Sequence, residues 1–284
     1  MKKIIIIVFI LFSSIYSQNN LFKSHPYGTL GTAESLTAST SAGDVDGDKD
    51  LDIIVANGRH WAQQNQIFFN DGKGFFRRSR SLGKEANTTY QIPMTDIDND
   101  GDLDLIVAND RTENQIFKND GNGNFLFDHY FGKKESNTRG LCIIDLNKDG
   151  YDDIVVANRK SQNYIYYNNS KGHFSKGQPF GNHDEATIKI ASADLNQDGY
   201  LDLVLANRNS QHNRIYYGPD YIKFSILGSD EDETRGVAIN DMNSDGILDI
   251  ITVNIGAKNN IYFGDKSGNF NKLQSFWKLP WPVL

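Results

Sequence analysis

The sequence predicts an all-β protein, and within that class a β-propeller of about five four-stranded antiparallel blades. Three observations lead to this prediction. A segment of about 50 residues recurs five times, each copy contains four strand-like stretches, and each copy places acidic side chains directly before an apolar run. With 284 residues and 38% hydrophobic side chains, the chain is long enough to bury a sizeable core.

The repeat is easiest to see in one segment of each copy. The copies read DVDGDKDLDIIVAN, DIDNDGDLDLIVAN, DLNKDGYDDIVVAN, DLNQDGYLDLVLAN and DMNSDGILDIITVN, and they begin at Asp44, Asp96, Asp145, Asp194 and Asp241. A threonine lies seven residues before each copy, and an asparagine ends each apolar run. This spacing places the predicted repeats near residues 31–82, 83–131, 132–180, 181–227 and 228–276.

The first predicted strand of each repeat runs from the threonine to the acidic cluster, as in TRGLCII. The residue three positions before the cluster is small in every copy: Ser41, Pro93, Cys142, Ala191 or Ala238. A strand that is crowded against a central axis needs small side chains. We therefore expect this strand to be the innermost of the four.

The other three strands follow from their composition. The second, such as DIVVAN, is apolar on both faces, so both faces must be covered. The third, such as NYIYYNN, is rich in aromatic residues, which strands favour, and glycine-rich turns such as DGNG often follow it. The fourth, such as FFRRSRSLG, is polar, and Arg77, Arg78 and Arg80 suit an exposed edge strand.

Such units could stack radially or as a solenoid. The small inner strand and the polar outer strand favour radial packing. Residues 19–30 resemble a fourth strand without its first three, and the C-terminal segment supplies a fourth strand to the last repeat. We expect five blades closed by an extra strand; the alternative is a chain that is incomplete relative to larger relatives.

The N-terminus differs from the rest of the chain. Lys2 and Lys3 precede an apolar run over residues 4–12, which predicts a secretory signal peptide at residues 1–17 and a propeller over residues 18–284. A membrane anchor is the alternative, but the run is too short to span a bilayer. We therefore expect a secreted, cell-surface or periplasmic protein with no membrane span after signal removal. Cys142 is the only cysteine, so no internal disulfide can form.

The acidic cluster is the strongest indication of chemistry. Counted from its first aspartate, each copy has oxygen-bearing side chains at positions 1, 3, 5 and 9, and glycine at position 6 in four of five copies. Crowded carboxylates repel each other, and a tight turn that glycine permits could direct them to one point. Hard oxygen ligands in this number suit Ca²⁺. A metal-free turn is the alternative reading of any single copy.

The cluster also resembles a known family. Its first six positions are similar to an EF-hand loop, but position 12 is not glutamate and no helices are expected beside it. With aspartate at position 9 and strands on both sides, it resembles the calcium loops of FG-GAP/VCBS repeats, which also occur in integrin α chains. The resemblance extends over roughly residues 22–276 and implies up to five structural Ca²⁺ ions.

By this resemblance, the metal ligands are the side chains at positions 1, 3, 5 and 9 of each loop. They are Asp44, Asp46, Asp48, Asp52, Asp96, Asp98, Asp100, Asp104, Asp145, Asn147, Asp149, Asp153, Asp194, Asn196, Asp198, Asp202, Asp241, Asn243, Asp245 and Asp249. Lys49 replaces glycine in the first loop, and asparagine at position 3 lowers the ligand charge of the last three. We expect unequal affinities, with the second loop strongest.

A binding surface is predicted where the repeats differ from one another. The residues just after the fixed threonines begin the inner strands, so they are expected to ring one mouth of the central channel. Insertions after the fixed asparagines reach their greatest length in GRHWAQQ. The candidate ligand-binding residues are Tyr90, Arg139, Lys189, Arg235 and Trp61. Ordinary solvated loops are the alternative.

Three functions are compatible with these features. The preferred one is an extracellular calcium-binding module for adhesion to a glycan or a protein, since a repeated surface suits multivalent contact. The alternative is a carbohydrate-active enzyme such as a polysaccharide lyase on a propeller scaffold, and the third is a structural domain of a larger assembly. No catalytic motif is evident, so no catalytic residue is assigned and a non-enzyme is preferred. The formal net charge of −7 argues against nucleic acid as a partner.

Overall fold

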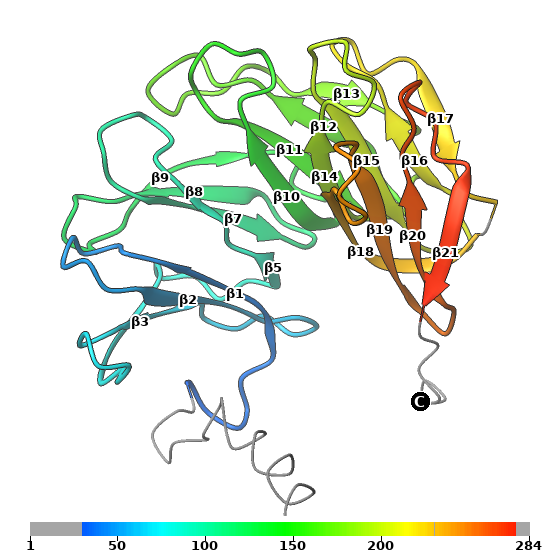
Figure 1. The fold of residues 1–284 in the computed structure, drawn as a ribbon. Coiled ribbons are helices and arrows are strands. Elements are labelled where there is room, and N and C mark those ends of the chain that lie inside the picture. Colours follow the sequence, from blue (N-terminus) through cyan, green and yellow to red (C-terminus); the bar gives the residue numbers. More distant parts are fainter. Residues whose placement is uncertain (1–29, 230, 277–284) are drawn as a thin grey trace, which may run out of the picture.

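The computed structural model describes residues 30–229 and 231–276, and the predicted signal peptide lies outside these residues. Within them the structure contains five antiparallel sheets, which Figure 1 shows as successive blades around a common centre. The predicted fold class is confirmed. No helix among the described residues is long and apolar enough to cross a bilayer.

The strands follow one another in chain order from the inside of each blade to its outside. The first blade contains β1 (Thr37–Gly43), β2 (Asp52–Asn57), β3 (Gln66–Phe69) and β4 (Arg78–Ser81). The second contains β5 (Thr89–Gln91), β6 (Met94–Thr95), β7 (Asp104–Asn109), β8 (Asn114–Lys118) and β9 (Leu126–Phe131). The third contains β10 (Thr138–Ile144), β11 (Asp153–Asn158), β12 (Asn163–Tyr166) and β13 (Gln178–Phe180). The fourth contains β14 (Thr187–Ala193), β15 (Asp202–Asn207), β16 (Asn213–Tyr216) and β17 (Phe224–Leu227), and the fifth contains β18 (Glu233–Asn240), β19 (Asp249–Ile255), β20 (Asn259–Phe263) and β21 (Lys272–Phe276).

The innermost strands share two local features. In all five, the register shifts at the residue after the fixed threonine, so this residue is a β-bulge. In the second blade the inner strand is also divided into β5 and β6. Pro93 lies between the two pieces and has no N–H group to donate, although its carbonyl still accepts from Ile106 N at 3.1 Å.

The core consists of four apolar clusters, one between each pair of consecutive blades. Neighbouring residues of a second strand point to opposite faces, so one strand contributes to two clusters. In β7, Leu105 and Val107 pack toward the first blade, whereas Ile106 and Ala108 pack toward the third. This two-sided burial explains why the second strands are apolar throughout.

Among the described residues, no apolar cluster joins the fifth blade to the first. Figure 1 shows the blades as an arc, with the first and last on either side of an opening. In the last blade Val253 is 46% exposed, and β21 is the fourth strand of that blade rather than a closing strand. The expected closure is therefore absent from the described strands, while residues 19–29, which were expected to form part of a fourth strand, lie outside them.

The fixed polar residues form a buried network within and between blades. In every blade the threonine hydroxyl donates to the asparagine that ends the second strand, at 2.8–3.0 Å. The next asparagine, at the start of the third strand, reaches the following blade, as in Asn65 Nδ2 donating to Thr89 Oγ1 at 2.9 Å. The same link joins Asn163 to Thr187 and Asn213 to Thr234. The repeated Thr and Asn residues thus align neighbouring blades.

Candidate metal centres

Each acidic cluster forms a tight loop between the first and second strands of its blade. Positions 4 and 6 adopt positive φ in all five loops. Position 6 is Gly101, Gly150, Gly199 or Gly246 in four loops, but Lys49 in the first, with φ of 75°. An L side chain is disfavoured in this region, so Lys49 is strained at a position where the other loops have glycine. At position 4 the arrangement is reversed, with Gly47 in the first loop and Asn99, Lys148, Gln197 or Ser244 in the others.

The aspartate at position 1 organises the loop through backbone N–H groups. In the second loop Asp96 accepts from Asp100 N at 3.0 Å and from Gly101 N at 2.9 Å. The same pair of bonds forms in the third, fourth and fifth loops. In the first loop, Asp44 keeps the bond from the position-6 group, Lys49 N, but accepts its other bond from Gly47 N at position 4. Position 1 therefore curls the backbone around its own carboxylate.

The aspartate at position 9 is fully buried in every blade and works as a clamp. In the second blade one Asp104 oxygen accepts from Ile97 N at 3.2 Å, and the other accepts from Asn119 N at 2.8 Å. It thereby ties the start of the loop to the residue after the third strand. All five blades repeat this pair of bonds. Burial raises the pKa of Asp104 and of Asp153 to about 6, although the backbone N–H groups oppose the shift.

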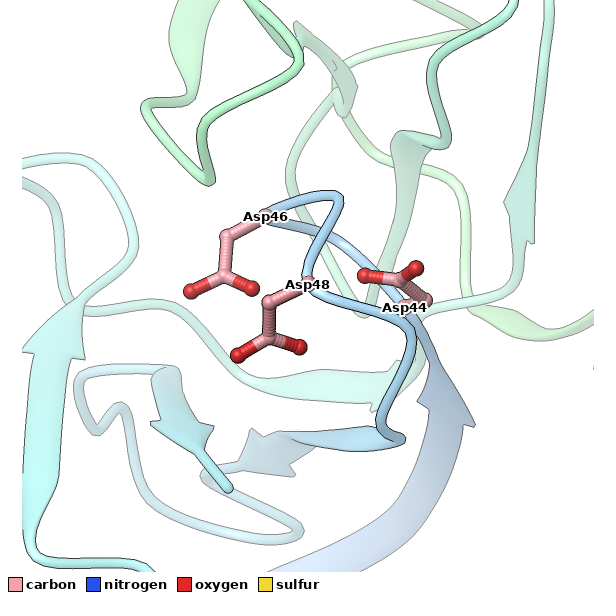
Figure 2. A group of neighbouring side chains, drawn as sticks. All are labelled: Asp44, Asp46 and Asp48. Atoms are coloured by element: carbon pink, nitrogen blue, oxygen red, sulfur yellow. The ribbon is translucent and has the colours of Figure 1, made fainter. Parts of the chain in front are cut away.

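Carboxylates converge most closely in the first two loops. Oxygens of Asp44, Asp46 and Asp48 lie within 4.8 Å of one another, and so do oxygens of Asp96, Asp98 and Asp104. Figure 2 shows the first group gathered around one turn of the backbone. Buried oxygens of Asp46 and Asp98 have no hydrogen-bond partner. Unpartnered buried carboxylate oxygens are what a hard cation such as Ca²⁺ would satisfy, so these residues fit the ion.

The last three loops use their position-3 asparagine differently. Asn147 Nδ2 donates to Asp149 Oδ2 at 2.9 Å, and the side-chain oxygen of Asn147 accepts from Asp149 N at 3.0 Å. Asn196 and Asn243 make the same two bonds with Asp198 and Asp245. Positions 3 and 5 are thus joined to each other by hydrogen bonds in loops that carry one fewer negative charge.

Two basic residues that were not predicted for these sites contact the position-3 aspartates. Arg78, from β4, pairs with Asp46 and lies over the Phe69 ring, 3.8 Å from its centroid. Lys118, at the end of β8, pairs with Asp98 at 2.7 Å. The corresponding residues to Lys118 are Phe69, Tyr167, Tyr217 and Phe263. The sequence feature that could have predicted the Lys118 contact is a lysine at a position that is aromatic in the other four blades.

The first two loops are also fastened by the next blade. Asn119 Nδ2 donates to Val45 O at 2.8 Å, and Asn168 Nδ2 donates to Ile97 O at 2.8 Å. The residues that occupy this place in the fourth and fifth blades are Gly218 and Gly264, which have no side chain to donate. The amide contacts therefore hold the loops between the first three blades.

The predicted ligand-binding residues lie at the other end of the inner strands. Tyr90, Arg139 and Arg235 are bulge residues, and the Arg139 guanidinium lies 4.1 Å from the centroid of the Tyr90 ring. Lys189 is half-buried in the fourth inner strand, and burial lowers its pKa. Trp61 is 74% exposed in the loop after β2. The structure thus brings Tyr90 and Arg139 together and leaves Trp61 on the surface.

The fold and its loops define a β-propeller whose blades each carry an acidic loop between the first two strands. The chain belongs to the family of FG-GAP-like repeats: the family model matches residues 44–107, 96–156 and 145–205. These matches confirm the resemblance seen in the sequence. A search among curated proteins found no match.

Solved structures resemble this chain in fold. The Dos1 propeller superposes with a TM-score of 0.59 at 12% identity, covering 87% of this chain and 60% of that one. BBS1N, crystallised in complex with ARL6DN, superposes with a TM-score of 0.57 at 13% identity, and the match covers 87% of this chain and 70% of BBS1N. The V. cholerae biofilm matrix protein Bap1 superposes with a TM-score of 0.54 at 17% identity, and the match covers 85% of this chain and 40% of Bap1. The chain therefore spans less than two thirds of Dos1 propeller and Bap1 chains.

Proposed function

We propose that this protein is a secreted, calcium-loaded propeller that serves as an extracellular binding or adhesion module for a glycan or a protein. The observation that carries the calcium part is the convergence of three carboxylates in each of the first two loops, with buried oxygens of Asp46 and Asp98 left unpartnered. Membership of the FG-GAP-like repeat family supports the same reading.

The side chains at positions 1, 3, 5 and 9 of each loop are the proposed ligands. A bound Ca²⁺ would offset the repulsion among carboxylates and hold the start of the second strand against the end of the first. Extracellular calcium modules bind at roughly 10⁻⁴ to 10⁻³ M. One site at ten times its dissociation constant contributes about 1.4 kcal/mol, and five independent sites about 7 kcal/mol. Whole domains are stable by only about 5–15 kcal/mol. Because the chain has one cysteine and can form no internal disulfide, calcium would supply the stabilisation that disulfides give to other secreted proteins.

A binding role is supported by the separation of the two ends of the blades. The calcium loops lie where the inner strands end, and variable residues such as Tyr90, Arg139 and Arg235 lie where they begin. A repeated scaffold with variable residues at one end suits recognition of an extended ligand. The neighbours BBS1N, which was crystallised with ARL6DN, and the matrix protein Bap1 are consistent with a binding role for this architecture.

Two measurements test the proposal. Thermal unfolding of the mature protein should shift to a lower temperature when a chelator removes calcium, and the shift should reverse when calcium is restored. An unchanged melting temperature, together with no calcium uptake in a calorimeter, would reduce the loops to metal-free turns. Incubation with a polysaccharide panel, followed by size-exclusion chromatography, tests the binding role: co-elution supports it, whereas shortened chains would assign an enzyme.

A further inference from the structure

An unusual density of arginine residues surrounds the end of the arc where the inner strands begin, which we call the axial mouth. Each blade contributes at least one residue from a bulge or from the loop after its second strand. The residues are Arg59, Tyr90, Arg139, Arg159, Arg208 and Arg235. This concentration of positive charge stands out in a chain whose formal net charge is −7.

The bulges place these side chains at the mouth. Tyr90, Arg139 and Arg235 each occupy the position at which the inner strand shifts register, and a bulge redirects its side chain relative to a regular strand. Arg159 and Arg208 follow the asparagines that pair with the fixed threonines. The inner strands behind them pack closely, since a Cβ on Gly140 would lie 2.8 Å from Ile188 O. The inner strands of the third and fourth blades therefore lie close together behind the mouth.

The cluster contains more positive charge than its acidic neighbours neutralise. Asp110 pairs with Arg139 at 2.7 Å and also with Arg111 at 3.5 Å, and Glu233 pairs with Arg208 at 2.8 Å. Among the described residues, the Arg159 guanidinium bonds only the neutral side-chain oxygen of Asn209.

Two further guanidinium groups of the mouth have no acidic partner among the residues that the structure describes. Among residues 30–229 and 231–276, no carboxylate lies within ion-pair distance of Arg59 or Arg235. Burial lowers the pKa of Arg235, and the positive charges of Arg208, Arg59 and Arg159 lower it further. The guanidinium groups of Arg208, Arg59 and Arg159 are thus each close enough to Arg235 to disfavour its positive charge.

A cavity at the mouth is lined by several cationic side chains and could hold part of a ligand. It has a volume of about 270 Å³ between the second and third blades, and its lining consists of Asp110, Arg111, Asn137, Arg139, Arg159 and Lys160. Four of these six side chains are cationic. Guanidinium forks match planar carboxylates through paired hydrogen bonds, so the cavity is suited to a carboxylate.

We propose that the axial mouth is a binding site for a polyanion, specifically a carboxylate-bearing polysaccharide such as a uronate polymer. The inference rests on the proposed function as an extracellular binding module and specifies its ligand class. Several arginines at one end of the arc suit a ligand that carries many carboxylates. The exposed Trp61 lies in the same loop as Arg59 and offers an aromatic face to a sugar ring, which favours a polysaccharide over an acidic peptide.

The test compares three probes in excess calcium: an oligogalacturonate, a neutral maltooligosaccharide of similar length, and poly-L-glutamate. Calorimetry should detect the oligogalacturonate only, and its affinity should fall as salt is added, because salt screens exposed charges. Arg235→Ala should weaken binding about tenfold, and Arg159→Ala combined with Arg235→Ala about a hundredfold, since each lost charge-assisted contact is typically worth about one factor of ten or more. Arg235→Lys should lose less than Arg235→Ala.

The matched control is Arg77→Ala, which removes an exposed arginine that stacks on Phe75 rather than lining the mouth; its affinity should equal that of the wild type. Circular dichroism of every variant checks that the fold is retained. Equal binding of the neutral oligosaccharide, unaffected by the arginine changes, would overturn the inference and leave the proposed binding function standing. Tighter binding of poly-L-glutamate would overturn the ligand class, and no binding of either charged probe would overturn the site. Oligogalacturonate binding that survives the double change but is lost on chelation would move the contact to the calcium loops and overturn the inference.

Discussion

The first two acidic loops and the last three share one backbone design but balance their charge in different ways. Loops one and two have aspartate at position 3, a basic side chain on that aspartate, and an asparagine amide from the next blade on the loop backbone. Loops three to five have asparagine at position 3, which bonds to the aspartate at position 5. The comparison separates two roles that the sequence motif combines: shaping the turn and supplying charge for a cation.

Shaping is common to all five loops. The carboxylates at positions 1 and 9 bond to backbone N–H groups in every blade, so the turn has internal supports that do not need an ion. Charge differs, because the first two loops concentrate three carboxylates within 4.8 Å. We therefore expect calcium to bind more tightly there than in the last three loops.

The largest effect should come from the shared clamp. Asp104→Ala removes a fully buried carboxylate and leaves two backbone N–H groups without acceptors. The free energy of unfolding should fall by about 3 kcal/mol or more, and Asp202→Ala should cause a similar loss in a loop of the other type. Urea denaturation with calcium and with chelator measures both. A loss for Asp104→Ala that disappears in chelator would show that this residue acts as a ligand rather than as a clamp.

An exchange of position 3 should convert one type of loop into the other. Asp98→Asn removes one negative charge from the second loop, and Asn147→Asp adds one to the third. Calcium affinity should fall about tenfold at the second loop and rise by a similar factor at the third, equivalent to about 1.4 kcal/mol each. Calorimetric titration of each single variant gives the affinities. Unchanged affinities in both variants would contradict the link between ligand charge and binding.

Lys118→Met should sharpen the same comparison. In the structure Lys118 Nζ lies 2.7 Å from Asp98 Oδ2. The ammonium group therefore offsets the repulsion among the carboxylates when calcium is absent, and it competes with a bound ion for Asp98. The variant should lose up to about 1 kcal/mol of stability in chelator and should show a larger rise in melting temperature when calcium is added. Lys171→Met is the matched control, because that side chain is absent from the loop contacts while its backbone carbonyl accepts from Lys118. A smaller calcium-induced rise in Lys118→Met would contradict this account.

The smallest effect should be a gain from Lys49→Gly. Lys49 has φ of 75°, and glycine adopts this conformation without the steric cost. Stability should rise by about 0.5 kcal/mol, because relief of strain exceeds the added entropy of the unfolded chain. The converse change, Gly101→Lys, should destabilise by about 1 kcal/mol, since a Cβ there meets no atom within 4 Å and only backbone strain acts. Thermal unfolding of both variants in chelator shows whether each change raises or lowers the stability.

Much of the fold could be predicted because the repeat is expressed in local sequence. Fixed threonine, aspartate and asparagine residues recur at constant spacing. The threonine hydroxyl and the position-9 aspartate make the same contacts in every blade. The number of blades, the order of strands within them and the position of the acidic loops followed from that regularity. The bulged residues after the threonines were also singled out, although the bulge itself depends on pairing with the second strand.

The remaining features depend on contacts between repeats. Lys118 reaches its loop from a third strand and Arg78 from a fourth strand. The sequences of these strands vary between repeats, and their register within a blade cannot be read from the sequence. The opening between the first and last blades depends on how many blades a given packing angle requires to close, which the repeat length does not specify. A weak signal existed: Val253 stands where other blades have alanine, as in Ala108 and Ala157.

The most direct test of the central claim is a calorimetric titration of the calcium-free protein with Ca²⁺. The account predicts binding in two classes, with two tighter sites assigned to the first and second loops and weaker binding at the other three. Asp98→Asn should remove one site from the tighter class and leave the rest unchanged. Five indistinguishable sites, or uptake that is unaffected by Asp98→Asn, would contradict the distinction between the loops, and no uptake at all would contradict the calcium assignment itself.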